Sequence, residues 1–157
     1  MGTDKAAVVV DGAPMGQLVR QALDAVCGAV VVVGGVDADV VDDGGGPLLA
    51  VIALLKSGRG GRFLIAATDQ PRLDANVLQP LIDVVVADTD GVAWDNEPLP
   101  LCIGIGALPR LEAAVAAGER RLRAAITVWL PLTSAAVRAG LVDVDTPADL
   151  AALRRHS

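Results

Sequence analysis

The sequence is poor in aromatic and sulfur-containing side chains. Aromatic residues make up 2% of the chain, and it holds 2 cysteines and 1 histidine. Two cysteines, Cys27 and Cys102, are too few for a metal cage, and both stand among apolar residues, where a free thiol packs as a small hydrophobe. His156 stands alone near the end of the chain, so no catalytic histidine is expected. Trp94 and Trp129 are interpreted as core or rim packing rather than as platforms for bases.

Basic residues and long apolar runs are also scarce. Lys and Arg number 13 against 19 Asp and Glu, a formal charge of -6, which excludes a protein that binds nucleic acid by neutralising phosphates. The longest nearly apolar stretch, residues 27–36, is interrupted by glycines and is far shorter than the roughly 18 residues of a membrane-spanning helix. The polar start, Met1-Gly2-Thr3-Asp4-Lys5, lacks the apolar core of a signal peptide. We therefore expect a cytoplasmic protein without nucleic-acid or membrane partners.

What the chain does have is enough apolar material for one core. It has 157 residues, 53% of them hydrophobic and 20% charged, which excludes the disordered class. No linker, repeat or low-complexity segment divides it, so residues 1–157 are expected to form a single domain.

Short β-branched runs alternate with segments whose apolar residues recur every three or four positions. The expected strands are 6–10, 29–33, 40–41, 63–67, 92–94, 99–105 and 141–144. The expected helices are 15–26, 47–55, 75–82 with Asp74 as its cap, 108–117, 120–126 and 147–155. This alternation predicts an α/β protein, a three-layer α/β/α sandwich around a mostly parallel, Rossmann-like sheet.

Ligands of such sheets sit beyond the carboxyl ends of the strands, and Asp69 directly follows the expected strand 63–67 and its Thr68. Its carboxylate is placed to hold a hard divalent cation, although an Asp that accepts backbone amides in a turn is an equal alternative. Alternate Asp residues also occur at 37/39, 88/90 and 143/145, a pattern common in solvated turns. Asp145 stands out because Thr146-Pro147 opens a helix after it, but a simple helix cap explains it too.

Several of these segments, in this order, resemble the motifs of the molybdenum cofactor guanylyltransferases, a family within the nucleotidyltransferase superfamily. The family signature L-A-G-G-x-S-x-R-M-G-x-D-K ends as this chain begins, with Met1-Gly2-Thr3-Asp4-Lys5. The other matching segments are G-A-P-M at 12–15, V-V-D-D at 40–43, G-P-L-L-A at 46–50, T-D-Q-P at 68–71 and D-V-D-T-P-A-D-L at 143–150.

The resemblance implies roles for four residues. Lys5 would grip the nucleotide phosphates and act in catalysis, Asp43 would contribute to the nucleotide site, and Asp69 would bind the nucleotide and hold a catalytic Mg²⁺. Asp145 would be a second metal contact. It further implies that the protein transfers GMP from GTP to a molybdopterin-type cofactor, releases pyrophosphate, and meets molybdoenzyme maturation proteins as partners.

Two departures from the family pattern leave alternatives open. Both Asn residues of the closing motif are Asp here, as in cytidylyltransferase relatives. The family's first strand and glycine-rich turn are absent ahead of Met1, so we expect Met1 to be an internal methionine or an artificial boundary. The alternatives are a cytidylyl- or other guanylyltransferase for a different phosphorylated acceptor, and a degenerate nucleotide-binding module.

Overall fold

The computed structural model describes residues 7–35, 37–42, 44–84, 86–144 and 146–154. The strands are β1 (Val9–Val10), β2 (Ala13–Pro14), β3 (Arg62–Ile65), β4 (Gly91–Trp94), β5 (Glu97–Gly104) and β6 (Val128–Leu130). The α-helices are α1 (Met15–Asp24), α2 (Pro47–Lys56), α3 (Ala75–Asp83), α4 (Leu108–Ala116), α5 (Ala135–Gly140) and α6 (Pro147–Arg154). Two 3₁₀ turns, η2 (Ile105–Ala107) and η3 (Leu122–Ala125), flank α4.

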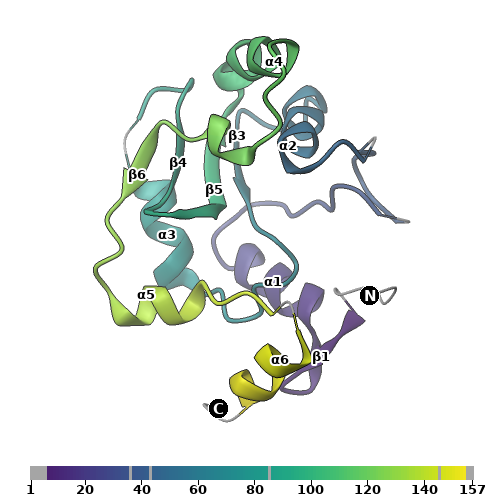
Figure 1. The fold of residues 1–157 in the computed structure, drawn as a ribbon, viewed down its shortest axis with the longest axis vertical. Helices are drawn as coiled ribbons and strands as arrows, with labels where there is room; N and C mark the ends of the chain where they lie inside the picture. Colours follow the sequence, from purple (N-terminus) through teal and green to yellow (C-terminus); the bar gives the residue numbers. More distant parts are fainter. Residues whose placement is uncertain (1–6, 36, 43, 85, 145, 155–157) are drawn as a thin grey trace.

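The main sheet has the strand order β3-β5-β4-β6 (Figure 1). β4 and β6 are parallel, whereas β5 is antiparallel to both β3 and β4. β3, β4 and β6 therefore point the same way, as expected, and β5 is reversed. The reversal follows from the two-residue turn Asp95-Asn96, because strands joined by so short a connection form an antiparallel hairpin. Asn96 has φ 64, a left-handed conformation that Asn tolerates well.

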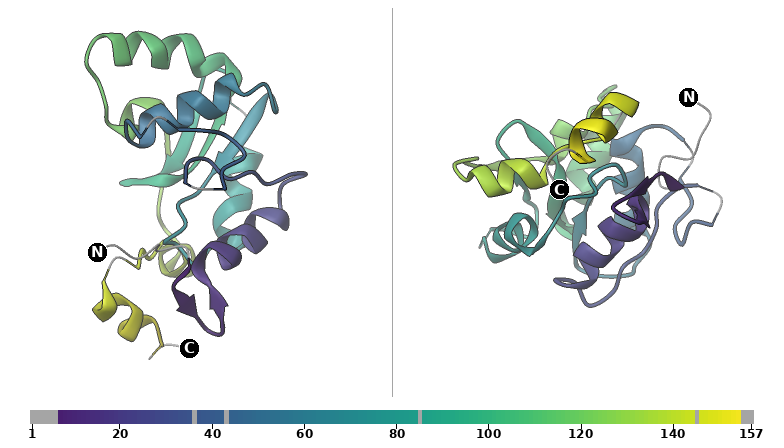
Figure 2. Two further views of the ribbon diagram at one scale, coloured as in Figure 1. Left: turned by 90° about the vertical axis from the view of Figure 1, so that its right-hand side faces the viewer. Right: turned by 90° about the horizontal axis from the view of Figure 1, so that it is seen from below.

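Both faces of the sheet are covered by helices, which gives the three expected layers (Figures 1 and 2). Successive side chains of a strand point to opposite faces, so β4 and β5 feed two cores. One core joins Ala93, Leu101 and Ile103 to α2, α4 and η3. The other joins Val92, Trp94 and Cys102 to α1, α3 and α5. The predicted α/β architecture is thus confirmed.

A third, smaller cluster lies apart from the sheet. Val10, Met15 and Val144 are buried together, with Val8, Leu18 and Leu150 partly buried around them. This cluster joins the β1–β2 hairpin and the start of α1 to α6, and these elements lie together at one end of the molecule (Figure 2). Residue 144 therefore belongs to a packed segment rather than to a surface tail.

The helices whose termini carried clear signals form where expected. The carboxylate of Asp74 caps α3 by accepting the amide of Val77 at 3.1 Å. Pro47 occupies the first turn of α2, and Lys56 lies in its last turn, near the negative end of the helix dipole. None of the described helices is long and apolar enough to cross a membrane.

The expected strand 29–33 is wrong. Its backbone bonds within the following loop instead: the carbonyl of Val32 accepts the amides of Asp39 and Val40, at 2.9 and 3.1 Å. The Asp39 carboxylate also accepts the Val32 amide, at 2.9 Å. Val33 and Val40 form only an isolated parallel bridge, which is all that remains of the strand expected at 40–41. The Val-rich run has strand composition, but in the described structure no strand of the main sheet pairs with it.

Two other expectations are also wrong. Residues 120–126 form only the short turn η3, because the Glu119 carboxylate takes the amides of Arg120 and Arg121, both at 2.9 Å, and holds them outside a helix. The expected strand 141–144 is an irregular segment after α5, and its Val144 amide pairs with a loop rather than with a strand. The sequence reading also missed β6 and α5, both of which are short.

Candidate functional site

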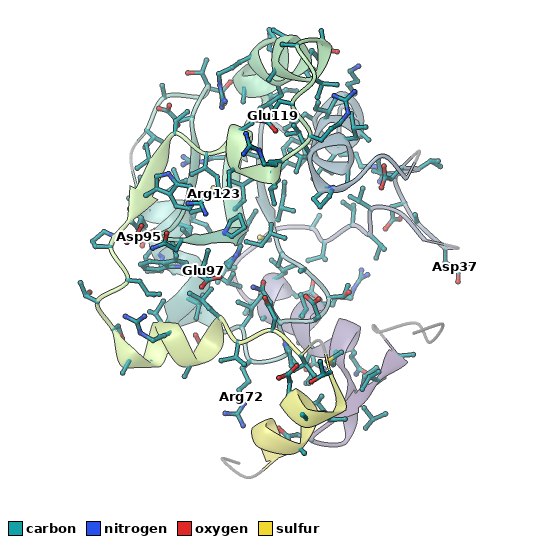
Figure 3. All side chains as sticks on the ribbon, in the orientation of Figure 1. Asp37, Arg72, Asp95, Glu97, Glu119 and Arg123 are labelled. Carbon is teal, nitrogen blue, oxygen red and sulfur yellow. The ribbon has the colours of Figure 1, made fainter. Side chains whose placement is uncertain are left out.

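The carboxyl ends of β3, β4 and β6 meet at one edge of the sheet. β5 begins at the same edge because it runs in the opposite direction. The polar residues there come from the loop after β3 and from the turn between β4 and β5, where Figure 3 shows Asp95 and Glu97. In open α/β sheets this edge is where ligands bind.

Asp69 lies in the loop that leaves β3 and is half-buried. Its backbone carbonyl accepts the amide of Val144 at 2.8 Å. This hydrogen bond holds the loop with T-D-Q-P against the segment that opens D-V-D-T-P. Asp69 and Val144, which are 75 positions apart in the sequence, therefore meet at the carboxyl edge of the sheet, where the sequence predicts ligand binding.

Gln70 follows Asp69 and is the buried polar residue of this loop, with 2% of its surface exposed. Its side-chain nitrogen donates to the carbonyl of Leu99 at 3.2 Å. This carbonyl belongs to the Leu99–Pro100 peptide bond, which is cis. Its side-chain oxygen is buried and has no hydrogen-bond partner among the residues that the structure describes. Gln70 was not expected to be a site residue, because no spacing or periodicity in the sequence distinguishes it from any polar residue in a turn.

Glu97, at the start of β5, has a carboxyl pKa that is shifted from its ordinary value. Burial raises the pKa of its carboxyl, the nearby Asp143 raises it further, and Arg138 partly offsets both. Glu97 and Asp143 thus make this part of the edge electronegative.

An apolar hollow of about 160 Å³ lies beside the end of β3. Its lining includes Val33, Pro47 and Ala50, together with Ile65, Ala66 and Leu99. Ala66 of the lining begins the loop that carries Asp69, so the candidate site has an acidic part and an apolar part.

The structure does not describe the other predicted site residues. Lys5, Asp43 and Asp145 lie outside the described residues, as does His156. Their assignments, like those of Asp69, stay predictions. After Asp145, the Thr146 amide and hydroxyl both donate to the Asp149 carboxylate, at 2.8 and 2.7 Å, so this pair caps the start of α6.

Asp88 and Asp90, which form another of the alternating pairs, accept hydrogen bonds both from their own turn and from other loops. Asp88 accepts the amide of Gly106 at 2.9 Å, and Asp90 accepts the amide of Ala87 at 3.0 Å and the hydroxyl of Thr127 at 2.7 Å. Within the described parts of the chain, no group of three or more His, Cys, Asp or Glu residues could hold a metal ion by itself.

The cysteine and tryptophan interpretations are confirmed. Cys102 is a buried free thiol and Cys27 is a half-buried one, and burial raises the pKa of Cys27. Trp94 is buried, and Trp129 is half-buried beneath the guanidinium of Arg123, 4.8 Å from its ring centre.

The chain is similar in sequence to two proteins that carry the same name. Over 94 residues it is 36% identical to a molybdenum cofactor guanylyltransferase of Pseudomonas putida strain F1, a match that takes in 56% of the chain and 48% of the relative. A second Pseudomonas putida protein of the same name is 34% identical, with the same coverage. The chain thus spans about half the length of the curated relatives it matches.

Molybdopterin-guanine dinucleotide biosynthesis protein A from Archaeoglobus fulgidus shares the fold. The two structures superpose with a TM-score of 0.66 at 20% identity, over 99% of this chain and 91% of that one. A sequence profile of the MobA-like NTP transferase domain matches residues 1–137. Since that profile accounts for most of the chain, the protein belongs to the family of MobA-like NTP transferase domains.

Proposed function

We propose that this protein transfers GMP from GTP to the phosphate of a molybdopterin-type cofactor and releases pyrophosphate. The family is one of NTP transferase domains, and two relatives are named molybdenum cofactor guanylyltransferases. A phosphate oxygen of the acceptor attacks the α-phosphorus of GTP, a new P–O bond forms, and the bond to the pyrophosphate leaving group breaks. Such a reaction asks the protein mainly for positioning and for neutralisation of phosphate charge.

The observation that supports this proposal most directly is the hydrogen bond from the Val144 amide to the Asp69 carbonyl, at 2.8 Å. It ties together two segments that carry family motifs, at the edge of the sheet where nucleotides bind in this kind of fold. A structure that placed Asp69 far from residue 144 would have no common site for the two motifs.

The chemistry of the donors at this edge fits Mg²⁺. Carboxylate oxygen is a hard ligand, and Mg²⁺ is usually held by one or two carboxylates, with water and substrate phosphates completing its shell. A complete protein cage is therefore not required, which agrees with the lack of one among the described residues. Asp69 would hold the ion, with Asp145 as a second contact, and the bound ion would neutralise charge on the α-phosphate.

The protein's own residues would orient the two substrates. Lys5 would grip the nucleotide phosphates, and Asp43 would contribute to the nucleotide site. The loop bearing Asp69 is fixed at both of its sides, by Val144 and by the bond from Gln70 to Leu99. A fixed backbone limits the movement of the attached carboxylate as charge shifts toward the leaving group.

Transfer of CMP from CTP is the second candidate. It is favoured by Asp143 and Asp145, which stand where the guanylyltransferase motif has Asn. Asp143 is exposed and contributes charge near Glu97, so this substitution changes the electrostatics of the site rather than its packing.

The test measures pyrophosphate release with Mg²⁺ and a molybdopterin-type acceptor, using GTP, CTP and ATP separately. We expect release with GTP and a large loss in Asp69→Asn. Asp24→Asn, on the exposed side of α1 where Asp24 pairs with Arg20, serves as the matched control and should keep full activity. Faster release with CTP than with GTP would favour the second candidate. Absence of release from a folded protein with every nucleotide would contradict both candidates.

A further inference from the structure

Arg123, in η3, differs from the other arginines in how its guanidinium is held. The other arginines whose side chains the structure describes are engaged by hydrogen bonds, ion pairs or other electrostatic contacts within the protein. The guanidinium of Arg123 makes neither a hydrogen bond nor an ion pair with any described residue, and it lies over the ring of Trp129, 4.8 Å from the ring centre. Arg123 is therefore a cation held in place by an aromatic ring.

Contact with an aromatic ring leaves the hydrogen-bonding capacity of a guanidinium intact. The attraction acts between the positive charge and the π-face of the indole, whereas the N–H donors lie at the rim of the guanidinium plane. Arg123 is exposed, so these donors are accessible from solvent. Their planar fork matches two oxygens of one carboxylate or phosphate. Trp129 thus holds the cation while the donors can bind an oxyanion.

The backbone that carries Arg123 is firmly held. Leu122 and Ala125 of the same turn are buried in the core. The guanidinium of Arg110 on α4 donates to the carbonyls of Ala124 and Ala125, at 2.6 and 3.1 Å, and so ties η3 to that helix. A cation that is already fixed loses little conformational freedom when a ligand binds.

Arg121, two residues earlier, shows what the same fork does when an oxyanion lies beside it. Its Nε and Nη2 donate to the two carboxylate oxygens of Glu119, at 3.0 and 2.9 Å. Arg123 extends from the same segment and has no carboxylate partner in the part of the chain that the structure describes. The two arginines therefore form a matched pair, one with an oxyanion supplied by the chain and one open to a ligand.

Arg123 lies near the carboxyl edge of the sheet, at the end opposite to Asp69. Trp129 is on β6, and the carbonyl of the next residue accepts the amide of Asp95 at 2.8 Å, at that edge. In the view of Figure 3, Arg123 is above Asp95 and Glu97. Two strands, β5 and β4, separate β6 from β3, so a group bound by Arg123 is distinct from a group bound by Asp69.

We propose that Arg123, held on Trp129, binds a phosphate group of a substrate, and that this group is not the α-phosphate assigned to Asp69. The choice of phosphate over other oxyanions rests on the proposed transfer reaction, in which both substrates carry phosphates. Glu97 and Asp143 make the neighbouring edge electronegative, which repels phosphate. A fixed cation offsets that repulsion and gives the substrate two charge-assisted hydrogen bonds.

The first experiment titrates the 157-residue chain with inorganic phosphate and follows the indole N–H signal of Trp129 by NMR. We expect a saturable shift that sodium chloride of equal ionic strength does not reproduce. Arg123→Gln should weaken phosphate binding about tenfold or more, because two charge-assisted hydrogen bonds are lost. No saturable shift in the folded, unmodified chain would overturn the proposal.

Arg121→Gln is the matched control for Arg123→Gln. It removes the same charge from the same segment, but Glu119 already occupies the fork of Arg121, so phosphate affinity should change by less than about threefold. Both arginines are exposed, and equal melting temperatures of the two variants would verify that the fold is kept. Equal losses of phosphate affinity in the two variants would overturn the proposal.

Two substitutions of Trp129 test whether its ring holds the cation. Trp129→Leu removes the π-face and should weaken phosphate binding about fivefold, whereas Trp129→Phe keeps an aromatic ring and should stay within about twofold of the unmodified chain. The side-chain Nε–H signal of Arg123 reports binding in both variants. A ring that only filled space would give equal affinities in the two variants, and that result would contradict the role of Trp129.

Two further ligands identify which substrate supplies the phosphate. Arg123→Gln should weaken binding of glycerol phosphate, a simple phosphomonoester, if the acceptor supplies it, and binding of GTP more than of guanosine if the nucleotide does. Unchanged affinity for both phosphate ligands would overturn the proposal. None of these titrations needs turnover, so phosphate binding by Arg123 in a chain that transfers no GMP would contradict the proposed function and leave this inference standing.

Discussion

β3 and β4 flank the same strand and are both mostly apolar, yet their surroundings differ. All four residues of β4 are buried, whereas Arg62 of β3 is exposed and Phe63, Leu64 and Ile65 are only partly buried. β4 has β5 on one side and β6 on the other, while β5 is the one partner of β3 among the strands that the structure describes. The burial of an apolar strand is therefore set by its neighbours in the sheet rather than by its own residues.

The candidate chemistry lies on the less buried side. Asp69 and the apolar hollow are at the end of β3, whereas β4 and β5 provide the centres of both cores. Regions with few buried contacts open and rearrange at lower free energy than a core does. This division suits a protein in which one half of the sheet supports the fold and the other half binds ligands.

The largest effect is expected from truncating one isoleucine at the centre of the sheet and one on β3. Ile103 on β5 is fully buried, while Ile65 on β3 is only partly buried within the same cluster. Ile103→Ala should lower the free energy of unfolding by about 2–5 kcal/mol. Ile65→Ala should cost less than half as much, because solvent and side chains can move into the hollow. Denaturant unfolding measures both, and equal losses would show that β3 is as well packed as the centre.

Removing one charge at the end of each strand separates their functions. Asp69 follows β3, and Asp95 directly follows β4. Asp69→Asn should lower turnover about 10²-fold or more, because it removes a charge placed to stabilise the transferring phosphate through Mg²⁺. Asp95→Asn should change turnover by only a few fold. Wild-type turnover in Asp69→Asn would remove Asp69 from the catalytic machinery.

Replacing tryptophan on either side of the sheet probes how firmly each strand is anchored. The indole nitrogen of Trp94 donates to the Val77 carbonyl at 3.0 Å and ties β4 to α3. Trp94→Phe should cost about 1–3 kcal/mol, since it removes this buried hydrogen bond and part of a buried ring. Trp129→Phe on β6 keeps an aromatic ring beneath Arg123 and should cost less than about 1 kcal/mol. Thermal unfolding of the two variants measures both losses of stability. A larger loss in Trp129→Phe than in Trp94→Phe would contradict this prediction.

The features that the sequence predicted correctly are those governed by local signals. Pro47 and Asp74 marked the starts of α2 and α3, and short apolar runs marked β4 and β5. The position of Asp69 at the end of a strand also followed from its place in the chain. Each of these depends on residues within one or two turns of one another.

The features that it did not predict depend on distant partners. The run 29–33 has strand composition, but a strand also needs a neighbour, and Val32 finds its hydrogen bonds in its own loop. β6 is short and exists because β4 offers it a parallel edge. The burial of Gln70 likewise comes from Leu99, a partner that no spacing in the sequence reveals.

Titration of Glu97 tests the edge where the two halves meet, and it has the smallest expected effect. Burial and the nearby Asp143 raise its pKa above the ordinary value of 4.5. The folded protein therefore holds this proton more tightly than the unfolded chain, so stability falls as pH rises from about 4.5 through the raised value, and the deficit persists at neutral pH.

Glu97→Gln removes this ionisation and should melt at a higher temperature than the unmodified chain at pH 7. The difference should shrink to nothing below about pH 4, where the carboxyl is protonated in both states. Glu112→Gln provides a control of opposite sign, because it breaks the exposed ion pair with Lys56 and should lower the melting temperature slightly. A gain in Glu97→Gln that stayed the same at every pH would mean that the substitution acts through packing, and that the charge of Glu97 has no part in the stability of this edge.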